Sequence, residues 1–290
     1  MRLLLASLVL LFTCFASAAE KLKVVTSFSI LADLTREIGG EDVALYNLVG
    51  ADADAHVYQP SPADARWLVA ADLIIANGLG FEPWLKRLRD SSEAGGRYLE
   101  ASKGVLPLML EEEGAPVADP HAWQNPANAR IYVDNIAAAL AAADPDNAAR
   151  YAQRRDAYLQ QLDVLLAQAK AELGSLQASQ RVIITSHDAF GYLGQAYGLR
   201  FLAPQGLSTE DEPSAAEVAA LIRQIRREKV RALFVENIRD PRLIEQIASE
   251  SGAVIGGTLY SDALAAEGPA SSYLGMFRHN IDTLLAALRP

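Results

Sequence analysis

Residues 144–176 read DPDNAARYAQRRDAYLQQLDVLLAQAKAELGSL, and this stretch predicts one long amphipathic helix. Asp144 is a suitable N-cap residue, Pro145 suits the first helical position, and Asp146 favours the positive end of the helix dipole. Apolar side chains then recur at helical spacing: Tyr151, Tyr158, Leu162, Leu165, Leu166, Ala169 and Leu173. A helix of about 30 residues spans roughly 45 Å, the size of a whole small protein. We therefore expect it to connect two halves of the chain.

On both sides of this helix, short apolar runs alternate with amphipathic segments. The runs that we expect to be strands are 23–26, 44–49, 73–76, 98–100, 182–185, 201–202, 232–235 and 254–259. The segments that we expect to be helices are 29–38, 61–70, 82–89, 125–143, 189–197, 214–229, 241–251 and 272–288. Residues 102–119 contain glycine, prolines and a run of glutamates, which predicts an exposed loop.

Strands separated by helices of this length indicate parallel sheets with right-handed crossovers. The predicted fold class is therefore α/β, with two α/β lobes that have parallel sheets and are joined by one long helix. The N-terminal lobe is expected at 20–143, the connecting helix at 144–177 and the C-terminal lobe at 178–290. Such an arrangement leaves a cleft between the lobes.

The first 19 residues have the pattern of a cleavable signal peptide. Arg2 precedes an apolar run at 3–15, and small residues follow at 16–19. We therefore expect an exported, periplasmic protein. Cys14 follows Leu11-Phe12-Thr13, which lacks the small residues usual before a lipidated cysteine, so we expect no lipoprotein.

Composition excludes several classes of function. Cys14 is the single cysteine of the chain, so the mature protein forms no disulfide and has no thiolate for a metal or for catalysis. The formal net charge is −10, which argues against nucleic acid as a partner. We expect a monomer.

Three of the four histidines lie in loops at strand ends, where parallel α/β sheets bind their ligands. They are His56, His121 and His187, and Asp262 follows the predicted strand 254–259 in an equivalent way. Three imidazoles and one carboxylate can close a tetrahedron around Zn²⁺. Each half contributes two of these groups, which places the predicted metal in the cleft. Their spacing carries no local signature, so a solvated or hydrogen-bonded role for each histidine stays open.

Four stretches carry a more specific signal: ADAHVYQPSP at 53–62, DPHAWQNP at 119–126, TSHDAFGY at 185–192 and LYSDAL at 259–264. Together with EPS at 212–214 and FVE at 234–236, they resemble the metal-binding solute-binding proteins of zinc and manganese ABC transporters. The resemblance implies a metal held between two lobes by His56, His121, His187 and Asp262. It also implies delivery of the metal to an integral-membrane ABC permease with a cytoplasmic ATPase.

Residue 187 bears on the choice of metal. Members resembling manganese binders carry glutamate there, whereas His187 matches the zinc-type pattern. Zn²⁺ is therefore the expected cargo, with manganese or iron as the alternative. The chain departs from many zinc-type members in its segment 102–119, which is short, has no histidine and offers only Glu111, Glu112 and Glu113 as cation-collecting groups.

Three carboxylates are expected to orient the imidazoles, with ordinary loop capping as the alternative: Asp119, Asp188 and Glu236. His279 is expected to lie outside the site. A zinc hydrolase is a competing interpretation, but Asp262 would fill the open position that catalysis needs, and no His-Glu-x-x-His motif occurs. A surface adhesin is disfavoured because adhesive repeats are absent from the sequence. We expect no enzymatic activity.

Overall fold

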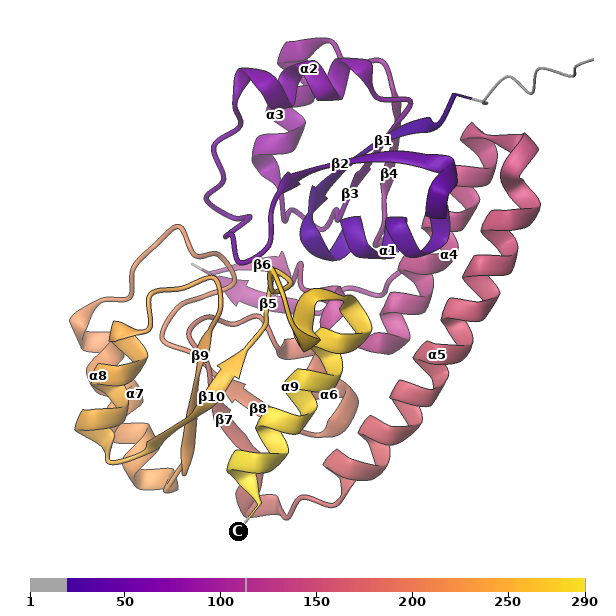
Figure 1. Cartoon of the computed structure of the whole chain (residues 1–290). Helices are drawn as coiled ribbons and strands as arrows, with labels where there is room; N and C mark the ends of the chain where they lie inside the picture. The colour runs from indigo at the N-terminus through magenta and orange to yellow at the C-terminus, as the bar shows by residue number, and fades with distance from the viewer. Residues whose placement is uncertain (1–19, 113, 290) are drawn as a thin grey trace, which may run out of the picture.

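The computed structural model describes residues 20–112 and 114–289, so the predicted signal peptide, Cys14 and Glu113 lie outside the described residues. Two lobes, each with a four-stranded sheet, lie one above the other, and one long helix runs alongside both (Figure 1). The predicted α/β architecture is confirmed. In the described part of the chain, every helix is too short or too polar to cross a membrane.

The N-terminal lobe is built on a parallel sheet with strand order β2-β1-β3-β4. Its strands are β1 (Leu22–Phe28), β2 (Val43–Val49), β3 (Leu73–Ala76) and β4 (Arg97–Glu100). Its helices are α1 (Ser29–Gly39), α2 (Pro62–Ala70), α3 (Pro83–Ser92) and α4 (Pro126–Ala143). β1 and β3 are buried almost throughout, as expected for strands that read as continuous apolar runs.

The C-terminal lobe repeats this plan, with strand order β10-β9-β7-β8 and parallel pairing. Its strands are β7 (Val182–Ile184), β8 (Arg200–Leu202), β9 (Ala232–Glu236) and β10 (Val254–Leu259). Its helices are α6 (Gly191–Tyr197), α7 (Ala215–Glu228), α8 (Arg242–Ser251) and α9 (Tyr273–Leu288). Short 3-10 turns lie at Gly40–Asp42, Ala122–Gln124, Pro145–Asn147, Ala178–Gln180 and Pro269–Ser271.

The long helix is α5 (Ala148–Gly174), whose 27 residues span about 40 Å. The side chains that it buries follow the predicted stripe: Tyr151, Tyr158, Leu162, Leu165, Ala169 and Leu173. It packs against α1 and α4 of the first lobe and against α6 and α9 of the second. The helix therefore supports both lobes along its length.

The α-helix begins at Ala148, later than predicted, although Asp144 stands at the N-cap of a 3-10 turn that leads directly into it. The backbone N–H of Asp144 still donates to the Leu140 carbonyl, so this residue ends α4, and the turn Pro145–Asn147 follows before α5 begins. The Asp144 carboxylate accepts hydrogen bonds from Asn147 Nδ2 and from the Tyr151 hydroxyl, both at 2.6 Å. Asp-Pro is compatible with a turn between two helices as well as with a helix start, and here the turn is formed.

The predicted loop at 102–119 is also wrong in part. β5 (Met109–Glu112) and β6 (Ala115–Ala118) form an antiparallel hairpin, with Gly114 in the turn at a φ of 78°. Most of the described residues of the hairpin are exposed or half-buried. Neither strand therefore shows the alternation of apolar and polar side chains that is typical of a strand with one buried face. The hairpin lies beside the region where the lobes meet (Figure 1).

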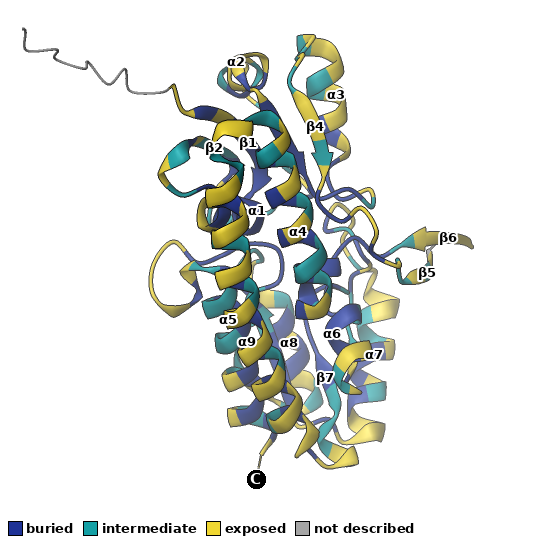
Figure 2. Ribbon diagram, turned by 90° about the vertical axis from the view of Figure 1, so that its right-hand side faces the viewer, coloured by how far each residue is buried: buried dark blue, intermediate teal, exposed yellow. Residues whose placement is uncertain are grey.

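The two lobes share one hydrophobic core. The main cluster of buried apolar side chains runs from β1 through α4 and α5 to α9, and a second, smaller cluster lies under α7 and α8. Figure 2 shows buried residues concentrated in the sheets and on the inner sides of the helices, with the outer face of α5 exposed. The lobes are therefore packed against each other rather than linked by a helix alone.

Replacing Leu162 by alanine is expected to lower the free energy of unfolding by about 2–5 kcal/mol, because this α5 side chain is fully buried in the shared core. Val164→Ala is the matched control on the same helix. Val164 is 58% exposed, so its loss should change the stability by less than about 0.5 kcal/mol. Urea denaturation of both variants measures the difference, and equal effects would contradict the packing of α5 against the lobes.

Candidate metal centre

Four predicted side chains converge between the lobes. His56 lies in the loop after β2, His121 lies just before the turn Ala122–Gln124, and His187 and Asp262 follow β7 and β10. One nitrogen or oxygen atom from each lies within 4.8 Å of the others. Within residues 20–112 and 114–289, no other group of three or more histidine, cysteine, aspartate or glutamate side chains meets in this way.

The distances between these atoms fit a small cation. Asp262 Oδ2 lies 3.1 Å from Nε2 of both His56 and His187. His121 Nε2 lies 3.4 Å from His56 Nε2 and 3.6 Å from Asp262 Oδ1. A tetrahedron with metal–ligand bonds of about 2.0–2.1 Å has edges of about 3.3–3.4 Å. The four groups thus approach tetrahedral spacing.

The cluster is removed from water. His121, His187 and Asp262 are fully buried, and His56 is 7% exposed. Among the described residues, both carboxylate oxygens of Asp262 and both ring nitrogens of His187 lack a hydrogen bond of regular geometry, so their close contacts are ion-pair contacts with His56, with Glu236 and with each other. A buried carboxylate costs several kcal/mol unless positive charge compensates it. The site is therefore chemically suited to a cation.

Two of the three predicted orienting carboxylates contact the imidazoles. Asp119 Oδ1 lies 2.8 Å from His121 Nδ1 and accepts the His121 backbone N–H at 2.9 Å. Glu236 Oε2 lies 2.6 Å from His187 Nδ1, and Oε1 accepts the backbone N–H groups of Ser186 and His187 at 2.7 and 2.9 Å. Both contacts turn Nε2 of the imidazole toward the centre of the cluster.

Asp188 is half-buried, and its backbone N–H donates to the Gly206 carbonyl at 3.1 Å. An orienting role for its carboxylate stays a prediction. His279 lies outside the cluster, with Nε2 at 3.1 Å from the Thr258 carbonyl and 3.3 Å from Thr283 Oγ1.

Two residues that support the cluster were not predicted from the sequence. Phe81 packs edge-on against the His56 ring, with centroids 4.8 Å apart. Gln124 is fully buried and donates to the carbonyl of Ser261, the residue before Asp262. Gln124 could have been suspected from its position close to His121 in the motif DPHAWQNP. The motif alone does not indicate, however, where the side chain points.

The buried charges shift each other's ionisation. Burial lowers the pKa of His187, but the carboxylates of Glu236 and Asp262 outweigh burial and hold that pKa well above its usual value. Burial raises the pKa of Asp262, yet His187 and His121 hold it well below its usual value. Burial raises the pKa of Glu236, but the charge of His187 together with hydrogen bonds from His187 and Ser261 outweighs burial and lowers that pKa. The raised pKa favours the protonated form of His187, whose positive charge compensates the neighbouring carboxylates.

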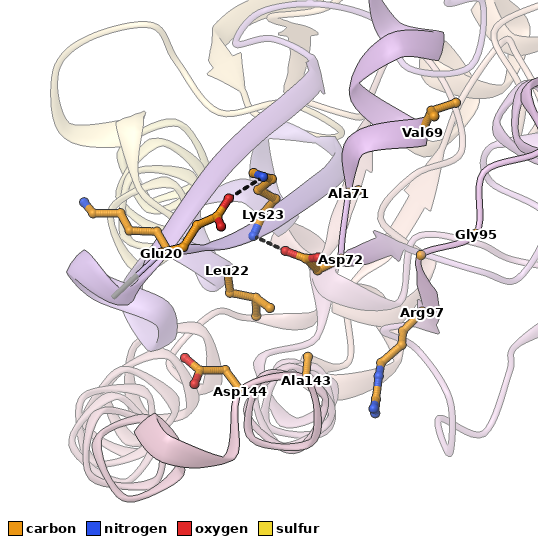
Figure 3. A pocket seen from close by; sticks show the side chains of 12 residues that line it. Glu20, Leu22, Lys23, Val69, Ala71, Asp72, Gly95, Arg97, Ala143 and Asp144 are labelled. Atoms are coloured by element: carbon orange, nitrogen blue, oxygen red, sulfur yellow. Dashed lines mark hydrogen bonds and ion pairs between the residues drawn. The ribbon is translucent and has the colours of Figure 1, made fainter. Parts of the chain in front are cut away.

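A pocket lies at the opposite edge of the first sheet, where its strands begin (Figure 3). Three of its charged residues are bonded to one another: Lys23 Nζ donates to Glu20 at 2.6 Å, and the Lys23 backbone N–H donates to Asp72 at 2.9 Å. The residues lining it include no histidine. The chemistry of the molecule is therefore concentrated at the cluster between the lobes.

Comparisons with known proteins agree with this geometry. Residues 24–287 match the model of the family described as ZnuA, zinc-uptake complex component A periplasmic. The chain belongs to this family. Its relatives include a substrate-binding lipoprotein of an ABC transporter and a periplasmic metal-binding protein, and this protein is a metal-binding substrate-binding protein of the same class and not an enzyme.

Three similar proteins illustrate the range of the family. The chain is 34% identical to the manganese ABC transporter substrate-binding lipoprotein PsaA of Streptococcus anginosus, over 94% of this chain and 91% of that protein. It is 33% identical to the iron-binding protein YfeA of Yersinia pestis, over 93% and 87%. The solved structure of the periplasmic zinc binding protein TroA from Treponema pallidum superposes with a TM-score of 0.89 at 34% identity, over 93% and 100%.

The expectation of no lipid anchor is contradicted by these comparisons. Several relatives that align over nearly the whole chain are named lipoproteins. The lack of small residues before Cys14 is thus too weak a signal to argue against lipidation in this family.

The ionisation of His187 predicts how pH affects stability. Because its pKa is raised in the folded, metal-free protein, the stability gained from its proton is complete below the unfolded-state pKa of about 6.5 and is lost as pH rises through the folded-state pKa. A bound divalent cation replaces that proton, so the stabilisation by metal should grow over the same range. Thermal unfolding of metal-stripped and zinc-loaded protein between about pH 6 and 9 measures both trends.

The control for this experiment is His187→Gln, which removes the titrating ring. The variant should lose most of the pH dependence of the metal-free protein above about pH 6.5. An unchanged pH dependence in the variant would show that His187 does not carry the proton.

Proposed function

We propose that this family member binds Zn²⁺ between its lobes through His56, His121, His187 and Asp262. In this proposal it acts as a monomer in the periplasm and delivers the ion to an integral-membrane ABC permease, with its cytoplasmic ATPase, for uptake. The observation that carries the proposal is the buried group of three imidazoles and one carboxylate, drawn from both lobes, with no second such group among the described residues.

The donor set supports zinc over manganese. Three imidazole nitrogens and one carboxylate suit the low coordination number of Zn²⁺, whereas Mn²⁺ prefers more oxygen ligands. The neighbouring carboxylates are already engaged: Asp119 with the His121 ring and Glu236 with the His187 ring and two backbone N–H groups. Asp262 is thus the main oxygen donor that faces the ion.

The second candidate is manganese or iron on the same site. It is favoured by the names of the relatives, which include a manganese and an iron protein at 34% and 33% identity. Because a divalent ion of either kind would meet the same four side chains, competition between metals separates the two candidates.

Calorimetric titration of metal-stripped protein comprising residues 20–290 tests the proposal. Zn²⁺ should bind at one tight site and stay tightly bound in excess Mn²⁺. His187→Ala should weaken binding by more than about 100-fold, since loss of a ligand should exceed the 10- to 100-fold cost of losing an outer contact.

His279→Ala is the matched control, because this imidazole bonds to Thr258 and Thr283 outside the cluster. It should leave the affinity for Zn²⁺ unchanged. Effective competition by Mn²⁺ would overturn the choice of metal, and full affinity in His187→Ala would overturn the ligand set.

A further inference from the structure

The carbonyl of Ser261, directly before Asp262, is held by two side chains from the opposite lobe. Trp123 Nε1 donates to it at 2.8 Å, and Gln124 Nε2 donates to it at 2.6 Å. A carbonyl oxygen has two lone pairs, so both are used. All four of these residues are fully buried, which removes competition from water.

We propose that Trp123 and Gln124 are positioning residues that hold the Asp262 carboxylate within reach of the three imidazoles and thereby raise the affinity of the site for its ion. The inference rests on the proposed function, in which Asp262 is a ligand. The two residues touch neither the ion nor the carboxylate, and they act through the backbone of Ser261.

The orientation of the Gln124 amide follows from its surroundings. Its Nε2 faces two carbonyl oxygens, that of Ser261 and that of Tyr260 at 3.4 Å. Carbonyl oxygens only accept hydrogen bonds, so the NH₂ group must point toward them. Its Oε1 has no hydrogen-bond partner among the described residues, so the side chain is held through its donor end.

The segment around Asp262 is fixed on both sides. Asn280 of α9 brackets Tyr260, accepting its N–H at 2.9 Å and donating to its carbonyl at 2.8 Å. On the other side, the Leu264 N–H donates to Ser29 Oγ of the first lobe at 2.9 Å. Between these two bonded positions, Trp123 and Gln124 hold the carbonyl of Ser261, the residue directly before Asp262.

The same two residues link a pair of ligands across the cleft. They follow His121 by two and three positions, so one short turn carries an imidazole and both donors. The Trp123 carbonyl in turn accepts the Tyr273 hydroxyl at 2.6 Å, which ties this turn to α9. In this proposal, Trp123 and Gln124 therefore fix the spacing between His121 and Asp262 and reduce the ordering that ion binding requires.

Two variants remove the donors, Gln124→Leu with a small change in volume and Trp123→Phe with the loss of one ring of the buried indole. Gln124→Leu eliminates the amide, and Trp123→Phe eliminates the indole N–H while keeping a ring against Phe28 and Phe81. Each should weaken Zn²⁺ binding by roughly 10-fold, as is typical for partners that orient a ligand. Calorimetry on residues 20–290 measures the affinity, and thermal unfolding of the metal-free variants shows that they are folded.

Asn135→Leu is the matched control. Its amide also donates to two carbonyls, those of Ala101 and Lys103 at 2.8 Å, but both lie in the first lobe. This variant should lower the unfolding temperature of the metal-free protein and leave the Zn²⁺ affinity within about twofold of the wild type. A merely structural role for Gln124 would give the same pattern as this control.

The deciding measurement repeats Gln124→Leu and Trp123→Phe in an Asp262→Asn background. If both residues act through Asp262, the roughly 10-fold losses should shrink to less than about twofold there. Losses that persist undiminished, or wild-type affinity in both single variants, would overturn the inference while leaving the zinc site intact. Full affinity in Asp262→Asn alone would instead overturn the proposed ligand set, and the inference with it.

Discussion

The buried carboxylate of Asp262 is the charge on which the rest of the site depends. It faces three imidazoles and lies in the interior, where an uncompensated negative charge is costly. A proton on His187 or a divalent cation can supply the compensating positive charge. Either one would lie close to Nε2 of His187, beside the Asp262 carboxylate. An ion bound at this cluster would therefore neutralise the buried charge, and we expect protons and metal to compete for the site.

The fold brings this charge and its partners together from distant parts of the chain. Parallel strands direct their carboxyl ends toward the cleft, so loops after β2, β7 and β10 reach it from two sheets. The lobes are also bonded directly at the cleft, as the Asp52 N–H donates to the Leu264 carbonyl at 2.9 Å and Thr209 Oγ1 to Asp54 at 2.6 Å. Together with the shared core and α5, these contacts hold the ligand loops close to the spacing that a small cation requires.

The proposed ligands His56, His187 and Asp262 were predicted because strand ends are visible as breaks after apolar runs, and these residues lie in the loops that follow. The structure brings them together with His121, and their role as metal ligands stays a prediction. The predicted start of α5 is too early, since Pro145 is compatible with both a helix start and a turn. The β5–β6 hairpin was not predicted, because short strands without a buried face leave no periodicity. The bonds from Trp123 and Gln124 to Ser261 are contacts between segments remote in sequence, and no local pattern encodes them.

A crystal structure of the zinc-loaded protein, with diffraction recorded on both sides of the zinc absorption edge, would show directly where the ion binds. We expect one anomalous peak between the lobes, about 2.0–2.2 Å from Nε2 of His56, His121 and His187 and from a carboxylate oxygen of Asp262. A peak elsewhere, or an ion bound by only some of these four side chains, would contradict the proposed zinc site.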